Sequence, residues 1–158
     1  MTAGPARVRE ARSDDRAFVV EAAARLAEFG APAGRTKEEI VAAETRTILR
    51  HFAAPVSTEA LLVAEDGERR PLGFAFVETG TDYFTGELHG HIGILAVSSA
   101  AQGTGAGGAL LAAAEDWSRR RGYRRLTLNV FAANQHARDV YEHVGFAAET
   151  LRYVKRLE

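Results

Sequence analysis

The feature that most constrains this chain is a glycine-rich loop between a strand-like run and a helical pattern. The loop, residues 98–108, reads SSAAQGTGAGG. Residues 89–97 before it carry apolar side chains on both faces, as in a buried central strand, and residues 109–121 after it have helical periodicity. Glycines let a backbone close around an anion, and a helix start offers free N–H groups. The pattern therefore predicts a cradle for a phosphate or pyrophosphate group.

Other interpretations of this loop are open. A Walker A loop ends in Gly-Lys-Ser or Gly-Lys-Thr, and this loop contains no lysine. Gly103, Gly105 and Gly108 satisfy the dinucleotide pattern G-x-G-x-x-G. However, the loop lies late in the chain, and no carboxylate ends the next predicted strand at 129–131. A glycine turn that only tightens helix packing is the third alternative.

Periodicity along the rest of the chain predicts a mixed sheet flanked by helices, in the order β-α-α-β-β-β-α-β-α-β. The gaps are short, which predicts one domain over residues 1–158. The predicted strands cover residues 7–12, 60–65, 71–78, 89–97, 125–131 and 147–157. The predicted helices lie between Ser13 and Gly30, between Thr36 and Pro55, over residues 109–121, and between Asn134 and Gly145.

Composition limits the classes of function that the chain can have. Cysteine is absent, which excludes disulfides, thiolate metal sites and a cysteine nucleophile. The net charge of −1 gives no general attraction to nucleic acid or an anionic membrane. No apolar stretch approaches the roughly 20 residues of a membrane span, and the N-terminus lacks a secretory apolar region. We expect a cytoplasmic protein that binds neither nucleic acid nor membrane.

Two segments of the chain carry motifs with defined spacing. Residues 95–107 contain the pattern Q/R-x-x-G-x-G/A through Gln102, Gly105 and Gly107. Residues 134–146 contain Asn134, Ala137, Tyr141, Gly145 and Phe146. Together the two segments resemble the GCN5-related N-acetyltransferase (GNAT) family. The resemblance implies an α/β (α+β) fold of GNAT type, with a mixed, mostly antiparallel sheet flanked by helices.

The resemblance implies transfer of an acetyl group from acetyl-CoA to a primary amine by direct attack in a ternary complex. The backbone of residues 102–108 would hold the pyrophosphate, and Leu95 and Val97 would pair with the pantetheine arm. A backbone N–H near Leu95, exposed by a bulge or splay, would stabilise the developing oxyanion. Asn134 matches a pantetheine contact, although Asn is also a common N-cap. The candidate cofactor-binding residues are Leu95, Ala96, Val97, Gln102, Gly103, Thr104, Gly105, Ala106, Gly107, Gly108, Asn134 and Tyr141.

Three residues are candidates for moving protons. Tyr141 matches the family's general acid, and its position on an apolar helix face also suits a core residue. His91, six residues before Val97, lies where related enzymes carry a Glu or His base, and an imidazole suits that task. Glu78 is a rival base, as is Glu87. A hydrogen-bonded core histidine is the alternative for His91.

His89 lies two residues from His91 and would share its strand face, so it could extend a proton relay. The His-x-His pair also suggests a metal site, but no third ligand is evident in the sequence and the family needs none. We therefore predict no metal.

The residues leave the acceptor open among small amines, amino acids, aminoglycosides, and protein N-termini or lysines. Residues 26–54 and 79–88 are expected to shape its pocket, and a homodimer is compatible with the family. The alternative functions are a non-catalytic CoA-binding regulatory module on the same fold and a phosphate-binding module outside the family. Candidate aromatic residues of the pocket lining are Phe29, Phe52, Tyr83 and Phe84.

Overall fold

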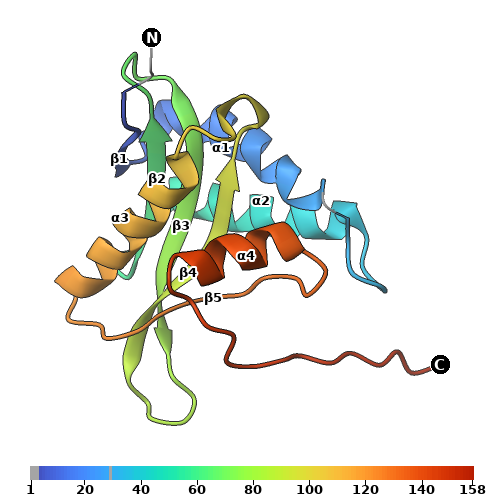
Figure 1. The fold of residues 1–158 in the computed structure, drawn as a ribbon. Helices are drawn as coiled ribbons and strands as arrows, with labels where there is room; N and C mark the ends of the chain where they lie inside the picture. The colour runs from blue at the N-terminus through green and yellow to red at the C-terminus, as the bar shows by residue number, and fades with distance from the viewer. Residues whose placement is uncertain (1–3, 29) are drawn as a thin grey trace.

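A five-stranded sheet forms the centre of the protein, and helices pack on both of its faces (Figure 1). The computed structural model describes residues 4–28 and 30–158. Every neighbouring pair of strands is antiparallel except β4 and β5, which are parallel. This arrangement confirms the predicted α/β fold with a mixed, mostly antiparallel sheet. The strands lie side by side in chain order as β1 (Arg7–Glu10), β2 (Glu59–Glu65), β3 (Pro71–Thr81), β4 (Leu88–Val97) and β5 (Leu126–Leu128).

The helices follow the predicted order, with one difference in the first of them. The helix predicted between Ser13 and Gly30 is divided into a 3-10 turn, an α-helix and a second 3-10 turn. Within the described ranges, no helix has both the length and the apolar character to cross a bilayer. The elements are η1 (Ser13–Asp15), α1 (Arg16–Ala23), η2 (Ala24–Ala27), α2 (Lys37–Ala53), η3 (Ser99–Ala101), α3 (Ala106–Arg120) and α4 (Gln135–His143).

The sheet has an apolar core on each face. Helices α1 and α2 cover one face, which we call the α2 face, where Phe74 and Phe76 of β3 pack near Ile48. Helix α3 covers the opposite face, the α3 face, where Trp117 belongs to the same buried cluster as Val77. Because side chains alternate along a strand, this assignment also places the polar residues of each strand on one face or the other.

Local signals begin α2 and end α4 where the sequence predicts, whereas α3 begins at Ala106, three residues before the predicted start. Thr36 Oγ1 accepts the Glu39 N–H at 3.1 Å, and the Glu39 carboxylate accepts the Thr36 N–H at 2.8 Å, which forms the predicted capping box of α2. Gly145 adopts φ +102°, and the Phe146 N–H donates to the Tyr141 carbonyl at 2.9 Å. The Phe146 ring then packs edge-on against the Tyr141 ring, so the end of α4 orients that side chain.

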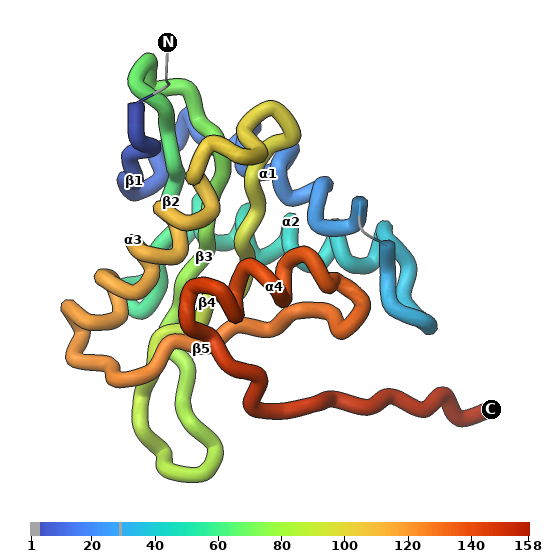
Figure 2. Tube along the Cα trace, viewed as in Figure 1, coloured from blue at the N-terminus to red at the C-terminus, as the bar shows by residue number. Residues whose placement is uncertain are grey.

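Strand β4 extends well past the end of β5. Their parallel pairing covers only Gly90 to Ile92 against Leu126 to Leu128, whereas β4 continues to Val97. Figure 2 shows the trace turning away from β4 after β5. The last part of β4 therefore has no β5 partner within the described chain.

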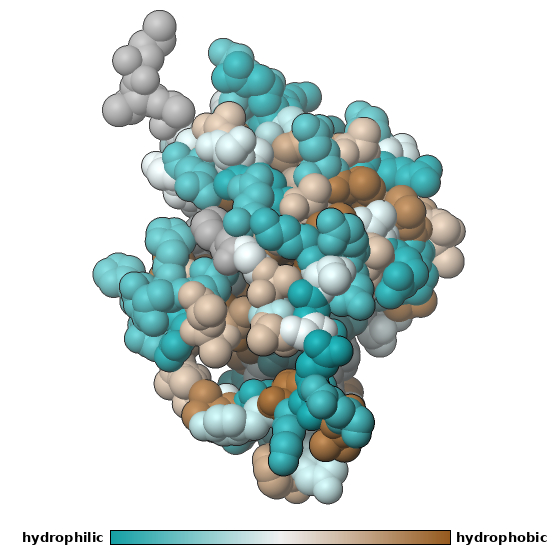
Figure 3. Space-filling model, turned by 90° about the vertical axis from the view of Figure 1, so that its right-hand side faces the viewer, coloured by the Kyte–Doolittle hydropathy of each residue, from teal (hydrophilic) through white to brown (hydrophobic). Residues whose placement is uncertain are grey.

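The last predicted strand, over residues 147–157, is wrong. These residues have no regular secondary structure, and Leu151, Tyr153 and Leu157 are all largely exposed. In Figure 1 the segment leaves α4 and runs away from the sheet. A strand needs a partner of matching length, and β5 offers only three residues. On the side toward which this segment runs, apolar residues form separate patches within a hydrophilic surface (Figure 3).

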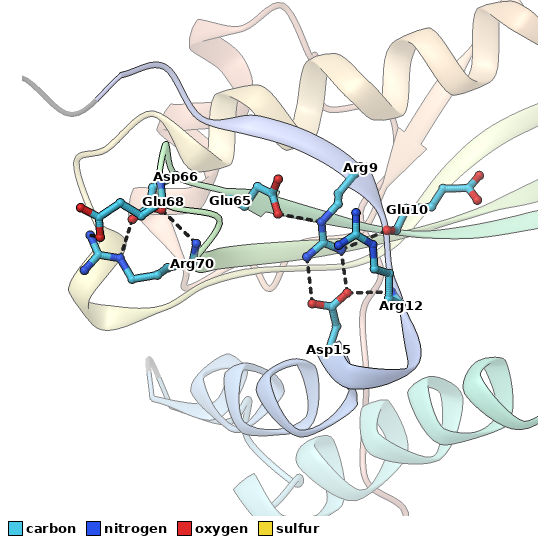
Figure 4. A network of polar contacts seen from close by, with 8 residues as sticks. All are labelled: Arg9, Glu10, Arg12, Asp15, Glu65, Asp66, Glu68 and Arg70. Atoms are coloured by element: carbon cyan, nitrogen blue, oxygen red, sulfur yellow. Dashed lines mark hydrogen bonds and ion pairs between the residues drawn. The ribbon is translucent and has the colours of Figure 1, made fainter.

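Arg9 of β1 joins three elements through two buried carboxylates (Figure 4). Its guanidinium donates to Asp15 at 2.7 and 3.1 Å and to Glu65 at 2.7 Å. Asp15 also accepts the Arg12 N–H at 2.7 Å. The hydrogen bond from Arg9 is the main reason why the pKa of Asp15 lies below its ordinary value. The network holds β1 and η1 against β2.

Arg9→Met should lower the free energy of unfolding by about 3 kcal/mol, because it leaves two buried carboxylates without their cation. The matched control is Arg70→Met, since Arg70 also pairs with two carboxylates, Asp66 and Glu68, but is 70% exposed. Urea unfolding at pH 7 measures both variants. Equal stabilities for the two variants would contradict the role given to Arg9.

The stability difference between wild type and Arg9→Met depends on pH. Because the folded-state pKa of Asp15 is lowered, its pairing stabilises the protein above the ordinary carboxylate value of 3.8. That contribution is lost as the pH falls through the lowered pKa of the folded state. The gap between wild type and Arg9→Met should therefore be widest near neutral pH and narrow below about pH 4.

Candidate active site

The unpaired end of β4 presents backbone groups that a ligand could bind. The Ser98 N–H donates to the Leu72 carbonyl of β3 at 2.8 Å. Since backbone hydrogen bonds alternate in an antiparallel pair, the N–H and C=O groups of Leu95 and Val97 point away from β3. They point to the side on which β5 has already ended. This edge suits an extended ligand that carries amide groups.

One of these groups already has a partner inside the protein. Arg25 of η2 donates from Nη1 to the Val97 carbonyl at 2.5 Å, and its Nε lies 3.1 Å from the Glu28 carboxylate. No local pattern predicts this contact, because Arg25 and Val97 are 72 residues apart.

The glycine loop beyond Val97 has the geometry of an anion cradle. Gly103 and Gly105 adopt φ values of +77° and +84°, in the left-handed region that favours glycine. Gly105 is the N-cap of α3, so the N–H groups of residues 105–108 have no partner within the helix. A Cβ added at Gly103, Gly105 or Gly108 would meet no atom within 4 Å. These three glycines therefore leave open space around the loop and the first turn of α3.

Gln102 and Thr104 lie in the predicted loop, whereas Ala106 and Gly107 lie in the first turn of α3. Gln102 is exposed and precedes the loop glycines, whereas Ala106 is buried beneath the start of α3. The Thr104 hydroxyl donates to the Ala101 carbonyl at 2.5 Å, which folds the loop on itself.

Helix α4 places Asn134 and Tyr141 on the α3 side of the sheet. Asn134 is the N-cap, and its Oδ1 accepts the Ala137 N–H at 3.2 Å. Tyr141 packs against the α3-face core, where burial raises the pKa of its phenol above the ordinary value of 10.0. The phenol is therefore protonated at neutral pH and available as a donor.

A row of polar side chains crosses four strands on the α2 face. Glu59 of β2 pairs in register with Glu78 of β3, Glu78 with His91 of β4, and His91 with Thr127 of β5. Neighbouring strands lie about 4.8 Å apart, so adjacent members of this row are within reach of one another. The structure brings the predicted residues His91 and Glu78 together at the centre of the row.

His91 is half-buried and has a defined partner. Its Nδ1 lies 2.8 Å from Thr127 Oγ1. Burial lowers the pKa of the imidazole below 6.5, the nearby Glu78 carboxylate opposes that shift, and His89 adds to it. The ring is therefore neutral at pH 7 and able to accept a proton.

A bulge in β4 lies directly beside this row. Phe76 pairs with Ile94 and Val77 pairs with Ile92, which leaves Gly93 as the extra residue. The position of a Cβ on Gly93 lies 3.8 Å from Glu78 Oε1. The irregularity expected near Leu95 is thus observed two residues earlier, and a glycine within a strand was its sequence signal.

The first member of the row, Glu59, was missed by the sequence analysis. Arg50 of α2 donates to its carboxylate at 2.6 and 3.0 Å, and His51 Nδ1 lies 2.8 Å from it. These contacts keep the pKa of Glu59 below its ordinary value despite its burial. Glu78 has no hydrogen bond or ion pair of this kind in the described chain.

The other predicted residues are more dispersed. His89 is on the same face as His91, and its Nδ1 is buried without a partner in the described chain. Glu87 is exposed near the end of the β3–β4 hairpin, where Tyr83 and Phe84 are 93% and 85% exposed. Phe52 packs against the α2-face core. Phe29 lies outside the described residues. No group of three metal-ligating side chains occurs within residues 4–28 and 30–158.

Comparison with known proteins gives the family. The model of the "Acetyltransferase (GNAT) family" matches residues 21–146, which include β4, the glycine loop and α4. This chain belongs to the GNAT acetyltransferase family. The resemblance inferred from residues 95–107 and 134–146 is therefore confirmed.

A curated relative of known name agrees with this assignment over part of the chain. The chain is 40% identical over 85 residues to a mycothiol acetyltransferase of Beutenbergia cavernae, across 54% of this chain and 27% of that protein. It thus spans about a quarter of the length of that relative.

Solved structures show the same fold at low identity. A Pyrococcus furiosus protein superimposes with a TM-score of 0.77 at 20% identity, covering 96% of this chain and 99% of that one. An aminoglycoside N-acetyltransferase in complex with CoA gives a TM-score of 0.70 at 18% identity, covering 99% and 98%.

Proposed function

We propose that this protein transfers an acetyl group from acetyl-CoA to a primary amine while both are bound. The observation that carries the proposal is the position of Tyr141 and His91 on opposite faces of the sheet. Tyr141 packs on the α3 face, together with Leu95 and Val97, and His91 lies on the α2 face. An acyl donor along the free edge of β4 would then have a proton donor on one side and a proton acceptor on the other.

The residues present fit acetyl-CoA, which supplies a reactive acetyl thioester when bound. The N–H groups of residues 105–108 would bind its pyrophosphate at the positive end of α3. Leu95 and Val97 would pair with the pantetheine amides through their backbone. The Leu95 N–H would also lie where it can stabilise negative charge on the acyl oxygen. Asn134 would contact the pantetheine arm with its amide group.

His91 would remove the proton from the attacking amine, and Tyr141 would give a proton to the departing thiolate. An amine enters as an ammonium ion at neutral pH and must lose a proton before it can attack. Glu78, next to His91 in the row, would attract the ammonium ion. Glu59 is already paired with Arg50 at 2.6 Å, so Glu78 is the carboxylate of the row that is left for a cation.

This arrangement supports a cationic small amine as the acceptor. The relative from Beutenbergia cavernae is named a mycothiol acetyltransferase. We include an amino-sugar amine among the acceptors to be tested, together with amino acid amides, a polyamine and a peptide N-terminus.

The test is release of CoA thiol from acetyl-CoA in the presence of each amine, with the acetylated product identified by mass spectrometry. Turnover with at least one amine is expected, and Tyr141→Phe should lower kcat by about 10²- to 10⁴-fold with little change in acetyl-CoA affinity. Acetyl-CoA binding without acetylation of any amine in the panel would favour a regulatory CoA-binding module instead.

A further inference from the structure

We propose that Thr127 is a positioning residue that fixes which nitrogen of His91 is free to accept a proton. The proposal rests on the function proposed above, in which His91 is the base. It adds a role for a β5 residue outside the two sequence segments that resemble the family.

Thr127 has two polar contacts that suit a hydroxyl donating to one side and accepting from the other. Thr127 Oγ1 lies 2.8 Å from His91 Nδ1 and 3.5 Å from the Gly90 carbonyl oxygen. A carbonyl oxygen can only accept, so in the longer contact Thr127 is the donor, and we infer that its single hydroxyl proton is directed to Gly90. The hydroxyl oxygen then accepts the Nδ1–H of His91. In the neutral ring this leaves Nε2 without a proton, as a general base requires.

The fold holds this contact at the one place where β4 and β5 pair. The Gly90 N–H donates to the Arg125 carbonyl at 3.0 Å, and Thr127 lies in register with His91. On the other side of β4, Gly90 packs against Ser118 of α3 so closely that a Cβ would collide with its hydroxyl. The strand segment that carries the Thr127–His91 pair is therefore restrained from both sides.

A hydroxyl partner also has an electrostatic consequence. A carboxylate at this position would direct the ring equally well, but its negative charge would hold a proton on the imidazole at neutral pH. Thr127 orients the ring without adding charge. The charged and titratable groups around His91 are Glu78 on β3, His89 on β4, and, beyond Glu59 of β2, Arg50 and His51 on α2.

The test compares Thr127→Val, which keeps the shape and removes the hydroxyl, with Thr127→Ser, which restores it. In the wild-type protein, the nitrogen chemical shifts of ¹⁵N-labelled histidine above pH 7.5 should show His91 with its proton on Nδ1. Thr127→Val should move that population toward Nε2–H and lower kcat roughly 3- to 10-fold. Thr127→Ser should recover both readouts.

The pH profile is the readout that a purely structural role would not change. The Thr127 oxygen also accepts from the charged imidazolium, so its loss should move the acid limb of the kcat profile to lower pH. Wild-type protein with the proton on Nε2, or a valine variant with an unchanged shift pattern and acid limb, would overturn the proposal.

Failure of the proposed function gives a different result. If His91 is not the base, His91→Ala keeps its activity whatever the tautomer of the ring is in the wild-type protein. If His91 is the base and Thr127 does not position it, His91→Ala loses activity, and Thr127→Val keeps both its rate and its ¹⁵N shifts.

Discussion

Gly105→Val should abolish acetyl-CoA binding in a protein that still folds. Gly105 is the N-cap of α3 at φ +84°, and an added Cβ there would project into open space. A branched side chain there occupies the ligand's space and forces the backbone out of the left-handed region. Losing two hydrogen bonds to a charged phosphate weakens affinity by at least roughly 100-fold. Isothermal titration with acetyl-CoA measures the effect.

Gly122→Val is the matched control for backbone strain. Gly122 ends α3 at φ +75° and also has no neighbour within 4 Å of an added Cβ. It lies at the opposite end of the helix from the cradle. The two variants should lose similar stability, but only Gly105→Val should lose acetyl-CoA affinity. An unchanged affinity in Gly105→Val would remove the pyrophosphate assignment.

His91→Ala should lower kcat by about 10²- to 10⁴-fold, the usual contribution of a general base. Because burial holds the pKa of His91 below 6.5, the wild-type rate should rise with pH on the acid side and level off before pH 7. The variant should lose this acid limb. Steady-state rates from pH 5 to 9, at saturating acetyl-CoA, measure both effects.

Glu78→Gln separates the base from its neighbour. If Glu78 only attracts the cationic acceptor, the variant should raise KM for the amine and keep an acid limb, shifted to lower pH because the carboxylate no longer favours the imidazolium. Loss of the limb in Glu78→Gln, with a retained limb in His91→Ala, would transfer the base role to Glu78.

The parts of the site that the sequence predicted depend on short-range signals. The glycine loop, the capping box of Thr36 and Glu39, and the ending of α4 at Gly145 are each determined by residues within one or two helical turns. The two segments that resemble the family, residues 95–107 and 134–146, are also recognised by the spacing of residues close together in the sequence. The structure accordingly reproduces these features and the strand–helix order around them.

The residues that were missed depend on pairing between distant strands. Thr127 lies 36 residues from His91, and Arg50 and His51 meet Glu59 across a helix–strand contact. Alternation in the segment Leu126-Thr127-Leu128 does indicate that Thr127 faces away from the apolar side. Only the register of β4 against β5 brings it next to His91.

The strand predicted over residues 147–157 shows that a local strand pattern does not by itself produce a strand. Its alternating side chains, with Leu151, Tyr153 and Leu157 at odd positions, are typical of a strand. A strand also needs a free sheet edge to pair with, and whether such an edge exists depends on how all the other strands are arranged. After the end of α4, the segment instead runs away from the sheet (Figure 1).

The most direct test of the central claim is a thermal shift with acetyl-CoA, CoA and ATP in parallel. A ligand at 100 times its Kd adds about 2.7 kcal/mol of stability, which for a chain of this size raises Tm by roughly 5–10 °C. Acetyl-CoA and CoA should both give such a shift, and ATP should give none. An equal shift with ATP, or no shift with either CoA species at millimolar concentration, would contradict the assignment of the glycine loop and the free edge of β4 to acetyl-CoA.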